Sequence, residues 1–404
     1  MASSVLCDKK LREILQKYDP NLRITSYRVK LLHSLYLSEI HRIEANFEKD
    51  GEQFQTFFIV KTVPLNNSQG MKTVAEANLF YREALMYKVL LPRLKQEFGF
   101  NAFPRMLDAS SNGVDDYIAL LDLTLDGFRM VDRLKGLDWD HSLMTIQALA
   151  KLHASTYCLY GGDGKSILAD FPCFVEKFSR LETSTRNTMF EMEKMLKDNG
   201  LEHLVSRVLK SMGHEGFAKV VSLFETIPTE FPSVINHGDL WTCNMFFKYG
   251  ENDKENPLEV KFLDYQMPLI SSRCFDLSYF IFISADIKVL NERMMELLRS
   301  YFEAFNALCG QFGAKLPLEF NGIELSWEYF LKEWNIYRDI GLLCALRLVP
   351  LMYWEPKTTN DSAIQLFVSD DKEANGQKEV RETIWSSRIM KEKLLNLIEN
   401  HIPN

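Results

Sequence analysis

The sequence predicts an α+β fold, with a small sheet-plus-helix lobe followed by a large, mainly helical lobe. The chain has 404 residues, which is more than one hydrophobic core usually organises. β-like runs gather in the first third, whereas helical periodicity dominates after residue 138 and is interrupted by one β-like island at 234–266. We therefore predict an N-terminal lobe, residues 1–122, and a C-terminal lobe, residues 123–404.

In the N-terminal lobe, two extended runs flank a turn signal. SEIHRIEANF starts at Ser38 and QTFFIVKTV ends at Val63, and between them the dipeptide Asp50–Gly51 favours a hairpin turn. A helix is expected over about 74–91, and Pro92 is expected to end or kink it because the proline ring clashes with the preceding turn. The short apolar run 117–123 predicts one more strand.

In the C-terminal lobe, Asp138 is placed to cap the first helix. Further helical patterns cover about 175–199, 201–212, 216–226, 278–309 and 325–352. The β-like island contains NMFFKY, a polar turn ENDKENP and LEVKFLDY, which together predict a hairpin.

Composition and charge exclude several classes of protein. With 46% hydrophobic and 25% charged residues, the chain has ordinary globular composition and is not disordered. A net charge of −8 without Lys/Arg clusters argues against nucleic-acid binding. There is no apolar run of about 18 residues, and the N-terminus carries charges where a signal peptide is apolar. We expect no membrane partner and a cytoplasmic location, with the seven scattered cysteines reduced.

The island opens with residues that suit phosphoryl transfer. HGDLWTCN places His237, Asp239 and Asn244 in one loop, and Asp264 follows the apolar strand VKFL. Such a reaction needs one Asp to orient or deprotonate the attacking hydroxyl, and hard oxygen ligands for the Mg²⁺ that bridges the ATP phosphates. A chance His-x-Asp-x(4)-Asn match arises in roughly one chain in forty of this length, so capping within the loop is the alternative role for Asp239.

Two residues upstream complete the pattern. A strand lysine must reach the phosphates, and a helix glutamate must hold that lysine. Lys61 ends the run FFIV, and Glu83 shares a helix face with Phe80 and Tyr87, where a carboxylate among aromatic rings needs a partner. The alternatives are a solvent-exposed lysine on an edge strand and Glu76 as the partner.

These residues resemble the ecdysteroid kinase-like family (also called CHK kinase-like), a relative of choline kinases and aminoglycoside phosphotransferases. The matching segments lie in family order between about residues 55 and 282: FFIVK, LFYREALMYKVLLP, LDLTLDGFRMVDR, ALAKLHAST, INHGDLWTCNMFF, VKFLDYQ and FDLSYFI. The resemblance implies a protein-kinase-like bilobal fold whose N-terminal lobe binds ATP. It also implies transfer of the γ-phosphate to a hydroxyl of a small molecule. We predict no protein partner.

The resemblance also implies a role for each matching residue. Asp239 corresponds to the catalytic Asp, Asn244 and Asp264 to the Mg²⁺ ligands, and Lys61 with Glu83 to the phosphate-anchoring pair. The segment 120–123, with Leu121 and Leu123, corresponds to the hinge whose backbone meets adenine. Asp276 corresponds to an Asp that braces the catalytic loop, although a helix N-cap is an equally good role. His237 is expected to orient the loop, and His153 to be a structural histidine on an apolar helix face.

There are two departures from the family pattern. Leu121, Asp122 and Leu123 stand where Glu-Asp-Leu is frequent, and no glycine occurs between His33 and Ile43, where a phosphate-covering loop is expected. Ser34 and Ser38 could supply donors in its place.

The leading hypothesis is an ATP-dependent kinase for a small, lipophilic alcohol, such as an ecdysteroid or a hydroxylated xenobiotic. A choline-like kinase with a cationic acceptor is an alternative. A pseudokinase that binds ligand without turnover is another. A protein kinase is disfavoured because D-F-G, A-P-E and an activation segment are missing.

Overall fold

The computed structural model describes residues 6–35, 37–175, 189–190, 192–212, 214–251, 253, 255–353 and 387–402. Residue contacts divide the chain into two compact units. Unit 1 comprises Met1–Arg129 with Phe246–Met267, and unit 2 comprises Met130–Met245 with Pro268–Asn404. The island hairpin therefore belongs to unit 1 by its contacts, whereas the predicted lobe boundary at residue 122 stays a prediction.

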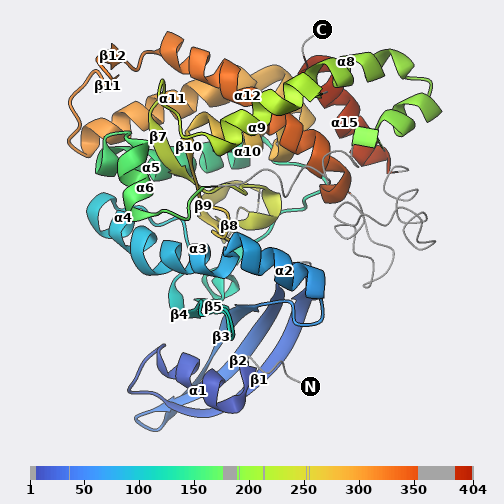
Figure 1. Cartoon of the computed structure of the whole chain (residues 1–404). Helices are drawn as coiled ribbons and strands as arrows, with labels where there is room; N and C mark the ends of the chain where they lie inside the picture. The colour runs from blue at the N-terminus through green and yellow to red at the C-terminus, as the bar shows by residue number, and fades with distance from the viewer. Residues whose placement is uncertain are drawn as a thin grey trace. The chain divides into compact units, whose positions relative to one another are not determined.

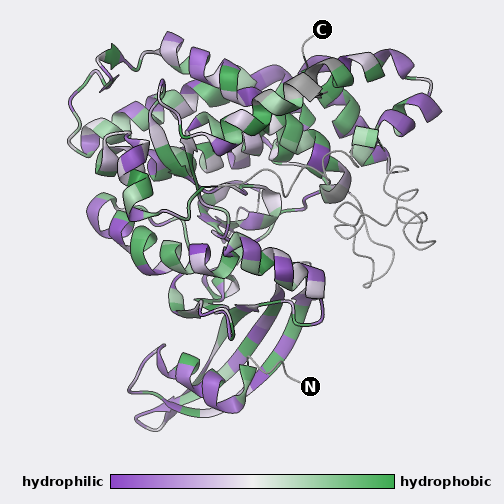
Figure 2. Cartoon of the chain, in the orientation of Figure 1, coloured by the Kyte–Doolittle hydropathy of each residue, from purple (hydrophilic) through white to green (hydrophobic). Residues whose placement is uncertain are grey.

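Unit 1 is built on a five-stranded antiparallel sheet (Figure 1). Its strands are β1 (Arg23–Ser34), β2 (Glu39–Lys49), β3 (Glu52–Thr62), β4 (Met106–Ser110) and β5 (Tyr117–Leu121), in the order β1-β2-β3-β5-β4. The predicted hairpin joins β2 and β3. Asp50 and Gly51 both have positive φ angles, 53° and 84°, which is the backbone that a two-residue turn requires. Alternate residues of β2 are buried, as the stripes on the strands in Figure 2 indicate.

The helices of unit 1 are α1 (Asp8–Gln16), α2 (Ser68–Ala77), α3 (Leu79–Leu85) and α4 (Leu91–Phe98), with a π-helical turn, Met86–Leu90, between the last two. Asn78, with φ of 53°, separates α2 from α3. Pro92 does not end the helical run, because it occupies the first turn of α4, where a proline is tolerated. A three-stranded sheet of β6 (Phe128–Arg129), β8 (Met245–Tyr249) and β9 (Pro257–Phe262) contains the predicted island hairpin.

Unit 2 is mainly helical. Its helices are α5 (Trp139–Tyr160), α6 (Gly164–Asp170), α8 (Glu202–Met212), α9 (His214–Glu225), α10 (Cys274–Ser284), α11 (Met294–Gln311), α12 (Trp327–Met352) and α15 (Arg388–Asn400). Its short strands are β7 (Ser233–Asn236) paired with β10 (Leu269–Ser272), and β11 (Glu319–Phe320) paired with β12 (Ile323–Glu324). Asp138 caps α5 as predicted, because its side chain accepts the His141 N–H at 3.1 Å.

The expected single helix over 278–309 is instead two helices. α10 ends at Ser284, and a π-helical turn, Val289–Arg293, precedes α11. Part of the expected helix at 175–199 lies outside the described residues. Within the described part of the chain, no helix combines the length and hydrophobicity that crossing a membrane requires.

Every residue of α10 is buried, and its closest helical neighbour is α12. Gly341 of α12 makes this approach possible, since a Cβ atom there would lie 2.3 Å from the Ser278 carbonyl carbon. The Ser278 hydroxyl donates across the contact to the Tyr337 carbonyl at 3.3 Å. Because α10 carries Asp276 and Tyr279, this packing fixes two residues of the site.

Candidate active site

The lysine predicted to anchor phosphates lies at the centre of the unit 1 sheet. Lys61 is on β3, hydrogen-bonded between β2 and β5, where its register partners are Ile40 and Ile118. Its side chain is buried. The alternative of a solvent-exposed lysine on an edge strand is therefore wrong.

The Lys61 amine contacts three acceptors. It lies 2.7 Å from Glu83 Oε2 and 2.9 Å from Gln266 Oε1, and it also donates to Asp264 Oδ1. The predicted ion pair with Glu83 of α3 is thus present, and Glu83 is 1% exposed. The competing carboxylate, Glu76, is an exposed residue of α2 that lies 3.9 Å from Lys72.

Burial and charge act in opposite directions on this cluster. Burial alone would lower the pKa of Lys61, but the carboxylates of Asp264 and Glu83 outweigh it and raise the pKa above its ordinary value. Burial raises the pKa of Glu83 to about 7, opposed by Lys61 and reinforced by Asp264. Lys61 therefore stays cationic across the physiological range, while two carboxyl groups compete for its charge.

Asp264 follows β9 in a left-handed conformation, with φ of 63°. An aspartate tolerates this backbone better than most residues, and it turns the side chain toward Lys61. Gln266 bridges the two, since its Nε2 donates to Asp264 Oδ2 at 3.2 Å and its Oε1 accepts from Lys61. Sequence reasoning gave Gln266 no role. The available signal was its place in LDYQ, two residues after Asp264.

In unit 2, β7 leads into the loop that carries Asp239. The Tyr279 hydroxyl donates to Asp239 Oδ1 at 2.5 Å, and Asn244 Nδ2 donates to Asp239 Oδ2 at 3.2 Å and to its carbonyl at 2.8 Å. Both of these hydrogen bonds use the side-chain nitrogen of Asn244, and its side chain forms no other hydrogen bond within the described chain. Its side-chain oxygen is therefore left for another ligand.

Asp276 braces the same loop. Its carboxylate accepts the backbone N–H groups of His237 at 2.6 Å and Gly238 at 2.9 Å, and α10 has no side-chain cap. The choice between bracing and helix capping is therefore decided for bracing. Gly238 has φ of 82°, a conformation that suits glycine and that presents its N–H to Asp276.

The two histidines make structural contacts. His237 Nδ1 accepts the Asp239 N–H at 3.3 Å, which orients the loop as predicted. His153 lies between the Tyr301 hydroxyl, at 2.7 Å, and Asp276 Oδ2, at 3.3 Å. Burial lowers the pKa of His153, and Asp276 opposes that effect. Among the described residues, no three His, Cys, Asp or Glu side chains gather as a metal site.

Tyr279 is a residue that sequence reasoning missed. Burial raises its pKa well above the ordinary value, and the nearby Asp239 carboxylate adds to the effect. The hydroxyl therefore remains a protonated donor to Asp239. Its spacing of three from Asp276 on α10, which places both on one helix face, was the signal that could have found it.

The predicted hinge lies at the end of β5. The Leu121 N–H donates to the Arg105 carbonyl at 2.9 Å, whereas the Leu123 N–H has no partner in the described chain. Asp122, at the departure from the family pattern, accepts the Thr124 N–H at 2.9 Å and pairs with Arg42 Nε at 2.7 Å. Asp122 thus shapes the turn after β5, and the Leu123 amide is the one left for a ligand.

The glycine-free segment forms the connection between β1 and β2. The Leu35 N–H donates to the Ser38 carbonyl at 2.8 Å. Ser38 is buried and Ser34 is exposed. Of the two serines considered as donors, Ser34 is thus the accessible one.

The sequence model of the ecdysteroid kinase-like family matches residues 34–313. Together with the antiparallel sheet of unit 1 and the helices of unit 2, this match confirms the predicted α+β, protein-kinase-like fold. No curated protein matches the chain.

Two solved structures are similar to this chain at 12% identity. The GDP and kanamycin complex of APH(2")-IIia has a TM-score of 0.43, covering 96% of this chain and 99% of that one. A choline/ethanolamine kinase family protein from Mesorhizobium loti has a TM-score of 0.38, covering 93% of each chain.

The buried charge cluster predicts a large coupling between Lys61 and Glu83. Lys61→Met should lower the free energy of unfolding by about 3 kcal/mol, because Glu83 loses its partner while buried. Adding Glu83→Gln should recover part of that loss, which urea unfolding of the four proteins at pH 7 would measure. The exposed pair Lys72 and Glu76 is the control, with an expected effect within about 0.5 kcal/mol. The predicted coupling between Lys61 and Glu83 would be wrong if the stability losses of the two single variants simply added in the double variant, as expected for Lys72 and Glu76.

Proposed function

The chain belongs to the ecdysteroid kinase-like family, and from this premise we propose that it is an ATP- and Mg²⁺-dependent kinase that phosphorylates a hydroxyl group of a small, lipophilic alcohol. The proposed acceptor is an ecdysteroid or a hydroxylated xenobiotic. The observation that carries the proposal is the buried Lys61 amine, in contact with both Glu83 and Asp264. A lysine amine that one carboxylate holds in place and that also contacts a second carboxylate is well suited to bind phosphate oxygens.

Mg-ATP supplies the phosphoryl group and the cation that neutralises charge on the phosphates. Glu83 holds Lys61 in place from α3, and the Lys61 amine binds phosphate oxygens. The same amine donates to Asp264. Asp264 would hold the metal ion, and Lys61, held by Glu83, would bind the phosphate oxygens.

The residues present fit a magnesium ion. Mg²⁺ prefers hard oxygen ligands and is usually bound by one or two protein groups together with substrate phosphates and water. Asp264 offers a carboxylate that is 29% exposed, and Asn244 offers a side-chain oxygen without another hydrogen bond in the described chain. We assign these two residues to the metal.

Asp239 is the group proposed to orient the acceptor hydroxyl and to take its proton. Tyr279 and Asn244 donate to different oxygens of its carboxylate, which fixes the carboxylate plane. Each carboxylate oxygen has two lone pairs, so Oδ1 can accept the acceptor hydroxyl beside Tyr279. Adenine would be held by the backbone of the segment after β5, where the Leu123 N–H lacks a partner in the described chain.

A pseudokinase is the second candidate, because the β1–β2 turn has no glycine to cover phosphates closely. It would bind Mg-ATP through the same residues and leave the phosphoryl group in place. A choline-like kinase with a cationic acceptor remains an alternative for the acceptor alone.

The first test uses Asp239→Asn as its control. Purified protein is incubated with Mg-ATP and a metabolite extract, and mass spectrometry is used to find species that gain a phosphoryl group. We expect such a species with the wild type and none with Asp239→Asn, whose affinity for Mg-ATP should stay within a few-fold. Mg-ATP binding without any phosphorylated product would favour the pseudokinase.

Asp264→Ala should remove the Mg²⁺ dependence of nucleotide binding, because it deletes the proposed carboxylate ligand. ATP affinity measured calorimetrically with Mg²⁺ and with EDTA should then be equal. Asp115→Ala, which changes an exposed aspartate of the same unit, should keep the difference. Retention of the full Mg²⁺ effect in Asp264→Ala would remove Asp264 from the metal site.

Tyr279→Phe should lower kcat roughly tenfold or more, because one charge-assisted hydrogen bond to Asp239 is lost. The KM for ATP should change little, since Tyr279 contacts none of the residues assigned to the nucleotide. Steady-state kinetics with the identified acceptor separate these constants, and Tyr81→Phe, at an exposed tyrosine, is the matched control. An unchanged kcat would show that Tyr279 does not position Asp239.

A further inference from the structure

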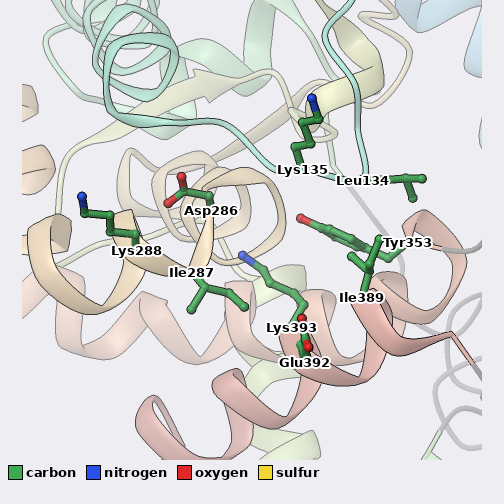
Figure 3. A pocket seen from close by; sticks show the side chains of 9 residues that line it. All are labelled: Leu134, Lys135, Asp286, Ile287, Lys288, Tyr353, Ile389, Glu392 and Lys393. Carbon is green, nitrogen blue, oxygen red and sulfur yellow. The ribbon is translucent and has the colours of Figure 1, made fainter.

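Unit 2 contains a cavity of about 310 Å³ that involves none of the residues assigned to phosphoryl transfer (Figure 3). Four segments line it: the chain before α5, the residues after α10, the end of α12 and the first turns of α15. Its volume is at the lower end of the range for small-molecule sites. The charges around it indicate what it could hold.

A buried lysine faces this cavity. Lys393 is 2% exposed, and its side chain runs from α15 toward the segment of Asp286 and Ile287 (Figure 3). Its amine donates to the Ala285 carbonyl, and no carboxylate of the described chain lies within 4.0 Å of it. A buried ammonium normally has a counter-ion, so this one lacks the group that would offset its desolvation.

The other charges around the cavity do not supply that counter-ion. Asp286 Oδ1 accepts the Val289 N–H at 2.6 Å, and Glu392 pairs with Arg388 at 2.8 Å. Lys135 and Lys288 also line the cavity, and neither forms an ion pair with a described residue. The described lining therefore carries three lysine amines and two carboxylates, those of Asp286 and Glu392, which leaves an excess of one positive charge.

Much of the remaining lining is apolar. Leu134, Ile287 and Ile389 contribute hydrocarbon side chains. The hydroxyl of Tyr353 donates to the Ile283 carbonyl at 3.2 Å. Tyr353 therefore contributes its aromatic ring to the lining. A ligand that matches this lining has a hydrophobic body and one anionic group.

We propose that this cavity binds a small organic anion, a carboxylate or a phosphate ester with an apolar body, whose charged group pairs with Lys393. Lys135 and Lys288 add attraction at the edge, and the three aliphatic side chains contact the body of the ligand. This site is separate in its residues from Asp239 and its neighbours, so it can exist whether or not the chain transfers phosphate.

Isothermal titration calorimetry with octanoate and octyl phosphate tests the proposal on the full chain without nucleotide. Octanol and octylammonium are the neutral and cationic controls. We expect at least one of the two anions to bind, with octanol and octylammonium at least about tenfold weaker. Binding of one anion and not the other identifies the head group, and equal binding of octanol would overturn the proposal.

Variants locate the anion. Lys393→Met should weaken binding at least about tenfold, because it removes the charge but keeps the length of the side chain. Lys135→Gln/Lys288→Gln, at exposed positions, should weaken it several-fold even if Lys393→Met folds poorly. Lys315→Met, at an exposed lysine away from the cavity, and Asp239→Asn should leave it unchanged. Unchanged affinity in Lys393→Met with an unaltered melting temperature would refute the site.

The pH dependence gives an independent readout. Burial lowers the pKa of Lys393 to about 7, and Asp286 opposes that effect. Octanoate affinity should therefore fall between pH 6 and pH 8, as Lys393 loses its proton. The neighbouring His401 has its pKa lowered to about 4 by burial, with Arg338 and Lys393 adding to the effect, so it stays neutral in this range. A flat profile would contradict the pairing with Lys393.

Discussion

The buried carboxylate of Asp276 is the interaction on which the geometry of unit 2 depends. A carboxylate without exposed surface is stable only when hydrogen bonds replace its water, and here the N–H groups of His237 and Gly238 do so. The loop that carries Asp239 must therefore adopt one conformation for α10 to be buried. The close packing of α10 on Gly341 of α12 fixes the other side of the same helix. The burial of α10 and the conformation of the loop are thus coupled in the folded chain.

In unit 1, hydrogen bonds again replace the water of a buried charged group, but here the group is a cation. Lys61 is a buried cation whose hydrogen bonds come from three segments, through Glu83, Asp264 and Gln266. Burial is the main cause of the raised pKa of Glu83; Lys61 opposes the effect, and the second carboxylate, that of Asp264, adds to it. This arrangement favours a further cation. Asp264 would be the residue of this cluster that holds a metal ion, whose charge would offset that of the second carboxylate.

Local chemistry explains which features could be predicted from the sequence. The turn at Asp50–Gly51 needs two positive φ angles, and few dipeptides other than this type supply them. β1 was not predicted, although Tyr27, Val29 and Leu31 alternate with charged residues; most of its residues are exposed. The break after α10 was hidden because apolar residues continue on both sides of it. Gln266 and Tyr279 act through contacts with Asp264 and Asp239 that only the folded chain creates.

Three buried cations other than Lys393 have a carboxylate partner within the described chain. Lys61 contacts Glu83, Arg273 contacts Glu333 at 3.1 Å with both side chains fully buried, and Lys261 contacts Glu259 at 2.7 Å. In each case the chain supplies the counter-ion that burial requires. Lys393 has a backbone carbonyl instead, and it faces a cavity. Burial lowers the pKa of Lys393, and an anion bound in the cavity would favour the charged form of the amine, which is the physical argument for an external counter-ion.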